Sequence, residues 1–242
     1  MDFLVKNAMK TYKRKREDLT PTIKVAVMID GGYFVKRFDS LYNESKSMNG
    51  EDVAECLYQL AHRHFRRTDY LYRIFYYDCL PFDKKHHYPI TNRAIDFSKS
   101  QAYKFRVDLI NALKRKRKLA LRMGKLKEGG WRIRPDRLKR LLKKEISFED
   151  LTDDDMYLDL RQKGIDMKIG VDIASLSFNR LVDKIVLFSG DSDFVPASKL
   201  ARREGIDFVL DPMQGHIEQD LFEHIDGVFE STRNFTPKRK QQ

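Results

Sequence analysis

A short apolar run followed at once by two aspartates most constrains how this chain can fold. Residues 185–188 (IVLF) end at Ser189, and Asp191 and Asp193 follow within four residues. Pro196 then opens a predicted helix, because proline is favoured in a first helical turn. A buried strand that carries acids at its carboxyl end, just before a helix, is typical of the ligand-binding edge of an open α/β sheet. The stretch therefore predicts an α/β fold with a site at that edge.

A second predicted strand brings another acid to the same edge. Residues 23–29 (IKVAVMI) are apolar and β-branched, and they end at Asp30. The helical spacing of residues 52–65 and the aromatic strand 70–77 complete a strand–helix–strand unit, which implies a parallel sheet. The carboxyl ends of parallel strands lie on one side of a sheet, so Asp30 is expected beside the acids at 191 and 193. A helix N-cap is the alternative role for Asp30.

The stretch 163–172 (KGIDMKIGVD) adds two more acids. Asp166 is predicted to cap a helix over residues 167–181, and Asp172 lies six residues later inside the apolar run 169–176. This spacing lets both acids reach one rim of the sheet. An acid inside an apolar run needs a cation or hydrogen-bond donors to compensate its burial.

Clustered carboxylates raise one another's pKa, and a hard divalent cation relieves that repulsion. Mg²⁺ and Mn²⁺ prefer oxygen ligands of this kind. The pattern therefore predicts a metal site that contains Asp30, Asp172, Asp191 and Asp193 and that activates a water for phosphodiester cleavage. No phosphate-binding P-loop and no G-x-G-x-x-G after a strand is present, which argues against a nucleotide triphosphatase or a dinucleotide enzyme.

The excess positive charge is confined to one segment. Residues 113–145 contain fifteen Lys and Arg against three Asp and Glu, a net charge of +12, whereas the other residues contain 32 and 33, a net charge of −1. Residues 119–123 and 131–134 are interpreted as a basic β-hairpin, and residues 135–145 as a basic helix. We expect nucleic acid to bind here, with a solvated basic surface as the alternative.

Basic side chains and one tryptophan form the predicted nucleic-acid surface. Trp131 is the only tryptophan; it either stacks on a base or packs within the hairpin. The predicted contact residues are Lys114, Arg115, Lys116, Arg117, Arg122, Lys125, Lys127, Trp131, Arg132 and Arg134.

The rest of the sequence sets the boundaries of a single domain. We expect a basic tail over residues 1–20, a domain over 21–232 with a basic insertion at about 83–159, and a disordered basic tail over 233–242. No apolar run is long enough to span a membrane. The two cysteines lack metal-site spacing, so a reduced compartment, cytosolic or nuclear, is expected, and we predict a cytoplasmic location.

Three motifs in series resemble the NYN domain, and more closely its LabA-like branch within the PIN-like nuclease superfamily. They are Ile29-Asp30-Gly31, Lys163-Gly164-Ile165-Asp166 with Asp172, and Ser189-Gly190-Asp191-Ser192-Asp193-Phe194. The resemblance covers roughly residues 22–230. It implies a PIN-like α/β/α sandwich with a central parallel sheet, here with a basic helix and hairpin insertion, and a ribonuclease that depends on Mg²⁺ or Mn²⁺.

The resemblance also implies roles for individual residues. Asp30, Asp172, Asp191 and Asp193 match the metal-binding acids, and Asp166 matches a helper acid. Many members have an asparagine that helps to position the site where this chain has Tyr33. The residues expected to shape the site are Gly31, Gly32, Tyr33, Ser189 and Ser192.

Three functions are consistent with this pattern. The first is a metal-dependent endoribonuclease acting on RNA such as mRNA or tRNA, with 5′-phosphate and 3′-hydroxyl product ends implied by the superfamily. The second is a nucleic-acid-binding regulatory module with a vestigial acid site. The third is a toxin or defence nuclease that cleaves a structured RNA. Homodimers are compatible with the sequence, but no stretch argues for an interface.

Overall fold

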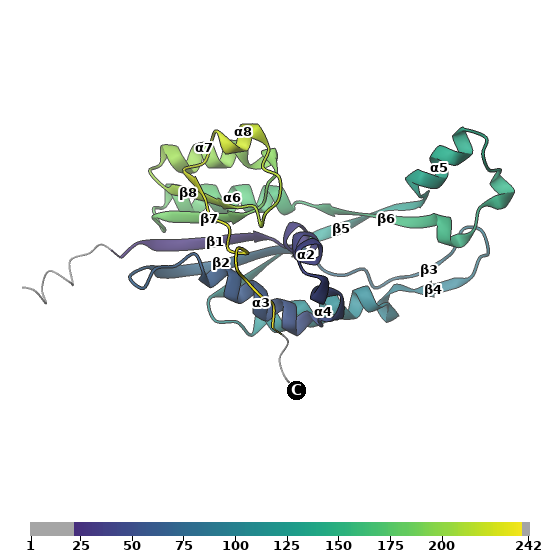
Figure 1. Cartoon of the computed structure of the whole chain (residues 1–242), viewed down its shortest axis with the longest axis horizontal. Helices are drawn as coiled ribbons and strands as arrows, with labels where there is room; N and C mark the ends of the chain where they lie inside the picture. Colours follow the sequence, from purple (N-terminus) through teal and green to yellow (C-terminus); the bar gives the residue numbers. More distant parts are fainter. Residues whose placement is uncertain (1–21, 239–242) are drawn as a thin grey trace, which may run out of the picture.

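The computed structural model describes residues 22–238 of the 242-residue chain. Its core is a seven-stranded, mostly parallel sheet with helices on both faces, as the sequence predicts (Figure 1). The expected basic tail over residues 1–20 lies outside the described residues. Within the described part of the chain, no helix is long and apolar enough to cross a membrane.

The sheet has the strand order β6-β5-β2-β1-β7-β8-β9. All neighbours are parallel except β5 and β6, which are antiparallel. The strands of the sheet are β1 (Lys24–Asp30), β2 (Tyr70–Cys79), β5 (Leu119–Ile133), β6 (Met156–Lys163), β7 (Lys184–Phe188), β8 (Asp207–Asp211) and β9 (Gly227–Val228). A separate antiparallel hairpin consists of β3 (Lys85–His87) and β4 (Ala94–Asp96).

Strand β1 is buried on both faces because helices cover both sides of the sheet. Val25, Val27 and Ile29 pack into one apolar layer, and Ala26 and Met28 pack into the other. The first layer is covered by α2 (Gly31–Leu41), α3 (Gly50–His62) and α4 (Gln101–Lys114). The second is covered by α6 (Ile165–Phe178), α7 (Val195–Arg203) and α8 (Gln219–Phe222). A strand buried on both faces has the continuous apolar sequence that parallel sheets require.

An arm projects from the carboxyl edge of the sheet (Figure 1). It consists of the second half of β5 paired with β6, the β3–β4 hairpin beside them, and α5 (Pro135–Leu142) at its tip. The predicted insertion at about 83–159 is therefore not continuous, because α4 and the first half of β5 belong to the central sandwich.

The predicted hairpin of residues 119–123 and 131–134 is wrong. Residues 119–123 and 131–133 belong to the single strand β5, and the pairing register with β6 shifts between Glu128 and Trp131. Gly130 has a positive φ of 80°. A Cβ on Gly129 would lie 2.6 Å from the Asp159 carboxylate. The two glycines thus form a β-bulge rather than a turn.

The C-terminal boundary also differs from the prediction of a tail that starts at residue 233. Phe235 packs against Tyr42, with 6.0 Å between the ring centroids, and the Arg63 guanidinium lies 5.9 Å from the Phe235 ring. The chain therefore contacts the domain at least as far as Phe235.

Replacement of Gly31 by alanine tests how tightly β1 and α2 pack against β2. A Cβ at this position would lie 2.5 Å from the fully buried ring and hydroxyl of Tyr76 and 2.8 Å from the Tyr77 carbonyl. We expect Gly31→Ala to lower the free energy of unfolding by about 1–3 kcal/mol, measured by urea denaturation. Gly170→Ala is the control: nothing lies within 4 Å of its Cβ, so it should stabilise α6 by up to about 1 kcal/mol. Equal stabilities of the two variants would contradict this packing.

Candidate functional site

Aspartates from three elements lie at the carboxyl edge of the sheet. Asp30 ends β1 and caps α2, where its Oδ1 accepts a hydrogen bond of 3.0 Å from the Tyr33 N–H. Asp191 follows β7 and accepts a hydrogen bond of 3.1 Å from the Asp193 N–H. Asp166 lies in the first turn of α6. The cap of that helix is Gly164, with a φ of 78°, and not Asp166 as the sequence suggested.

The charges of these acids are coupled. The pKa of Asp30 is raised to about 6. Burial is the largest cause, the carboxylates of Asp166 and Asp78 add to the rise, and hydrogen bonds from backbone N–H groups oppose it. Burial also raises the pKa of Asp166, and Asp193 and Asp191 add to this rise. Asp166 therefore links Asp30 electrostatically to Asp191 and Asp193, and we call these four aspartates the acid edge.

The donor chemistry of the acid edge fits a hard divalent cation, because it offers only carboxylate oxygens that repel one another. Within residues 22–238, however, no three His, Cys, Asp or Glu side chains form a group that could hold a metal ion. The acids share an edge and an electrostatic environment, and binding of a metal would require their side chains to close around it.

Asp172 lies apart from the acid edge. It is two turns further along α6, where its Oδ2 accepts hydrogen bonds of 2.9 Å from the Tyr77 hydroxyl and 2.9 Å from the Arg122 Nε. The sequence argument that this acid needs a cation or donors is thus met by an arginine and a tyrosine. Its predicted role as a metal ligand stays a prediction, as does RNA binding by Arg122.

Tyr33 joins α2 to the loop that follows β8. Its hydroxyl donates a hydrogen bond of 2.7 Å to the Pro212 carbonyl, and burial raises the pKa of this hydroxyl to about 12. The hydroxyl is also close to two glycines: a Cβ would lie 2.5 Å from it at Gly215 and 3.3 Å from it at Gly190. Tyr33 therefore holds the loops around the site together through a neutral hydroxyl.

The other residues expected to shape the site lie in the turns beside Asp30 and Asp191, and their role stays a prediction. Gly31 and Gly32 lie in the first turn of α2, and neither has a positive φ. A Cβ on Gly32 would lie 3.3 Å from the Gln162 side chain and 3.4 Å from Asp30 Oδ1. Ser189 is buried and its Oγ accepts a hydrogen bond of 3.3 Å from the Asp191 N–H. Ser192 begins the short 3₁₀ helix Ser192–Phe194.

A polar network that the sequence analysis missed lies next to Asp30 and is centred on the buried Asp78. Asp78, near the end of β2, accepts hydrogen bonds from Arg106 Nη1 at 2.5 Å, Gln162 Nε2 at 3.0 Å and the Tyr76 hydroxyl at 2.9 Å. Arg106 comes from α4 and Gln162 from β6. Asp78 had a detectable signal, because it directly follows an apolar strand, whereas no pattern marks Arg106 or Gln162.

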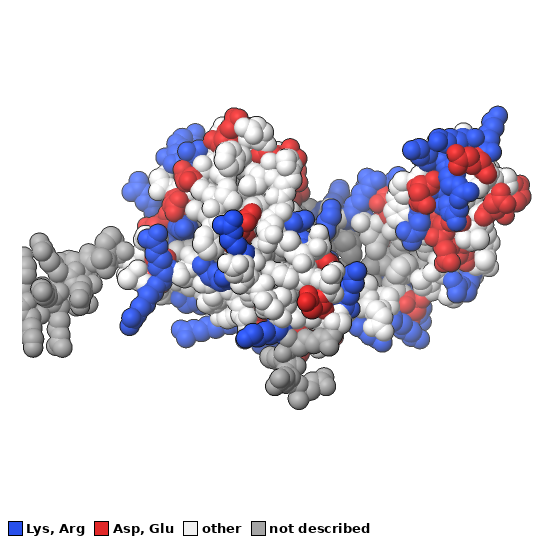
Figure 2. Space-filling view, in the orientation of Figure 1, with Lys and Arg blue, Asp and Glu red and all other residues white. Residues whose placement is uncertain are grey.

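The arm presents a basic face that begins at the acid edge. Along β5 and β6, alternate side chains point to opposite faces, as strand geometry requires. One face carries exposed cations, and Asp159 pairs with two of them, Arg132 at 2.8 Å and Arg161 at 2.9 Å. We call this surface the basic face; its cations are Lys125, Lys127, Arg132, Arg134, Arg161 and Lys163. Figure 2 shows Lys and Arg spread over the arm, interspersed with acids.

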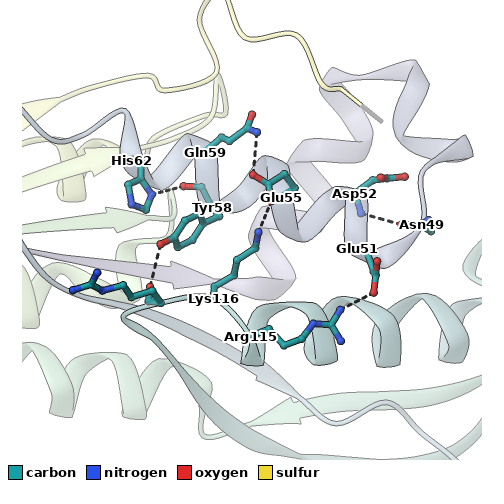
Figure 3. Close-up of polar contacts among 10 residues, drawn as sticks. Asn49, Glu51, Asp52, Glu55, Tyr58, Gln59, His62, Arg115 and Lys116 are labelled. Carbon is teal, nitrogen blue, oxygen red and sulfur yellow. Dashed lines mark hydrogen bonds and ion pairs between the residues drawn. The ribbon is translucent and has the colours of Figure 1, made fainter. Parts of the chain in front are cut away.

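Four of the predicted nucleic-acid contacts lie elsewhere. Residues 114–117 connect the end of α4 to the start of β5, at the amino edge of the sheet, opposite the acid edge. There Arg115 pairs with Glu51 of α3 at 2.6 Å and Lys116 pairs with Glu55 (Figure 3). Lys114, Arg115, Lys116 and Arg117 are therefore not part of the surface that borders the site.

Comparison with known proteins identifies the family. A family model described as the NYN domain matches residues 24–227, which contain the whole acid edge and the whole arm. A solved structure of a protein of unknown function from Vibrio parahaemolyticus is similar at 13% identity, with a TM-score of 0.43 over 86% of this chain and 93% of that chain. No curated protein matches the chain. The chain belongs to the NYN domain family, a nuclease-like family of the PIN-like superfamily.

Proposed function

We propose that this protein is a metal-dependent endoribonuclease of the LabA-like branch, which hydrolyses phosphodiester bonds of RNA at the acid edge. One observation carries the proposal. Four aspartates with coupled charges lie where β5 leaves the sandwich, so that a basic face and an acidic site are continuous. The basic face binds the phosphates of a substrate, and the acids remain available for chemistry.

Asp30, Asp166, Asp191 and Asp193 would hold Mg²⁺ or Mn²⁺ in this proposal. When bound, such an ion supplies an activated water and neutralises charge on the phosphate and the leaving oxygen. The chain's own groups do the rest. The hydrogen bond between Asp78 and Gln162 holds both side chains in place next to Asp30. The partly exposed Arg106 guanidinium, bonded to Asp78, offers its other N–H groups to a phosphate oxygen. The superfamily resemblance implies 5′-phosphate and 3′-hydroxyl products.

The alternative is a nucleic-acid-binding regulatory module with a vestigial site. Two observations favour it. Asp172 is held by Arg122 and Tyr77 rather than turned to the acid edge, and the position of the usual asparagine is occupied by a tyrosine that bonds to the Pro212 carbonyl. A cleavage assay separates the two functions because only the first requires the acids as ligands.

Cleavage of labelled RNA in Mn²⁺ tests the enzyme directly. We expect Asp191→Asn to slow cleavage by at least about a hundredfold, an effect typical of losing one charge-stabilising group from an active site. EDTA should abolish cleavage by the wild type. Asp207→Asn is the matched control, because Asp207 is an exposed acid at the amino end of β8, on the opposite edge. If the Asp191→Asn and wild-type proteins cleave at the same rate, the protein is not this enzyme.

Neutralising Asp30 should stabilise the metal-free protein at neutral pH. The pKa of Asp30 is raised from 3.8 to about 6 in the fold, so ionisation of this carboxyl costs the wild type stability as pH rises from about 4 to above 6. Asn caps a helix as well as Asp does. In EDTA, the free energy of unfolding of Asp30→Asn should therefore be higher than that of the wild type by up to about 3 kcal/mol at pH 7.5. Near pH 4 the two free energies, measured by urea denaturation, should be equal.

Addition of Mn²⁺ at pH 7.5 should make the wild type more stable than Asp30→Asn. The ion binds the native wild type and so raises its free energy of unfolding as the site fills. The Asp30→Asn variant lacks one ligand and should gain less. A Mn²⁺ effect that is equal in both proteins would argue against Asp30 as a ligand, whatever the cleavage assay shows.

The salt dependence of RNA binding tests the basic face. Removal of one phosphate contact should reduce the slope of log affinity against log salt by about 0.7 for a single strand. We expect Lys125→Ala with Lys127→Ala to flatten the slope by the equivalent of about two such contacts. Lys114→Ala with Arg117→Ala removes the same charge from the amino edge and should leave the slope unchanged. Equal slopes for the two double variants would refute the assignment of this face.

A further inference from the structure

A pocket of about 320 Å³ opens in the arm, between the β5–β6 ribbon and the β3–β4 hairpin. It is lined mainly by the ribbon face opposite the basic face, and Arg134 and Tyr157 of the basic face join the lining where the ribbon ends. Trp131 and Leu158 come from paired positions of β5 and β6, and Phe97 follows β4. The pocket therefore has an apolar interior, whereas the basic face of the same arm is charged.

The walls of the pocket are aromatic. The Trp131 and Tyr88 rings lie 5.1 Å apart between centroids, with an angle of 36° between their planes. The Arg93 guanidinium lies 4.8 Å from the centroid of the Tyr88 ring. The Tyr88 and Trp131 side chains are half-buried and both line the pocket, so part of each ring faces its interior, where a flat ligand could stack.

Polar groups lie at the mouth of the pocket. Arg134 lines it and donates from Nε to the Asp154 carbonyl at 2.8 Å, a contact that fixes the direction of its guanidinium. Asp154 is exposed and also lines the pocket. Its neighbour Asp153 is instead buried and bonded to Thr91. At the mouth, the Arg134 guanidinium could donate to a phosphate or to an acceptor atom of a base. The Asp154 carboxylate could accept from an amino group of a base.

We propose that this pocket binds one unpaired base of the RNA strand whose phosphates lie along the arm. A base is flat and largely apolar on its faces, with donors and acceptors only at its edge, which matches aromatic walls and a polar mouth. Its phosphate would remain outside, near Arg134 and Arg93. The inference rests on the proposed function only for the class of ligand, nucleic acid.

The position of the pocket gives it a consequence for substrate choice. Trp131 is seven residues along β5 from Gly124, which pairs with the end of β2 at the acid edge. At about 3.3 Å per residue the pocket lies roughly 20 Å from the acids. A base bound here would be several nucleotides away from the cleaved bond, so the pocket selects substrates with a single-stranded segment at that distance.

Trp131 provides a direct signal for the test because it is the only tryptophan in the chain. The probe is a short 2′-O-methyl RNA oligonucleotide, titrated into the full-length Asp191→Asn protein in EDTA. Stacking on the indole should quench its fluorescence saturably. An abasic oligonucleotide of the same length carries the same phosphates and should bind without quenching. Equal quenching by both oligonucleotides, or none by either, would overturn the proposal.

Variants locate the signal within the arm. Loss of one stacking partner costs about five- to 150-fold in affinity, so Tyr88→Ala should weaken binding of the oligonucleotide within that range and leave binding of the abasic one unchanged. Trp131→Phe keeps an aromatic wall and should weaken binding less than Trp131→Ala, which guards against a variant that only disrupts the arm. Phe148→Ala is the control: this side chain is 70% exposed and does not line the pocket.

The outcomes separate this inference from the proposed function. The titration uses a protein that lacks an acid of the site and contains no metal, so quenching does not depend on cleavage. If the wild type fails to cleave RNA but the base-dependent quenching persists, the pocket stands and the nuclease proposal falls. If RNA is cleaved and Trp131 does not respond to bases, the pocket proposal falls and the nuclease proposal stands.

Discussion

The parallel pairing of β1 with β2 on one side and β7 on the other is the constraint on which the site depends. It sets Asp30 opposite Tyr77, one residue before Asp78, and sets Ile29 opposite Phe188, where β7 ends. Because β1 alternates between two apolar layers, a slip by one residue would exchange those layers. The packing of the core therefore fixes which acids meet at the edge, although none of the acids contributes to that packing.

A change of partner along β5 creates the arm. Up to Gly124 the strand is parallel to β2 inside the sandwich; beyond it, β5 pairs with the antiparallel β6 and leaves the sheet. From that point only one face is covered, by the β3–β4 hairpin, and the sequence changes from continuous apolar residues to alternation of apolar and basic ones. The bulge at Gly129 makes room for Asp159, which holds Arg132 and Arg161 on the outer face.

The order of the core strands and helices could be predicted from the sequence, since each buried strand is an apolar run and four of them lead to an aspartate, namely Asp30, Asp78, Asp191 and Asp211. The arm could not. Gly129-Gly130 has the composition of a hairpin turn. It is a bulge because β6, more than twenty residues later in the chain, pairs with β5 on both sides of the two glycines. A count of charge located the basic segment but could not tell the acid edge from the amino edge, where residues 114–117 lie. Arg106 comes from the middle of a helix and has no local pattern at all.

Asp211 and Asp30 both lie at the carboxyl ends of strands, but their surroundings differ. Asp211 shows how this fold compensates the burial of a carboxylate. Asp211, at the end of β8, is fully buried with His64 Nε2 at 2.9 Å and accepts hydrogen bonds from two backbone N–H groups, at 3.0 Å and 3.1 Å. Among the described residues, Asp30 accepts hydrogen bonds only from backbone N–H groups at the start of α2; burial, and then the carboxylates that face it, raise its pKa to about 6. The fold can therefore supply a buried carboxylate with enough hydrogen-bond donors, as it does for Asp211. An acid left without them, beside others that repel it, is better explained by a ligand that brings positive charge than by any contribution to folding.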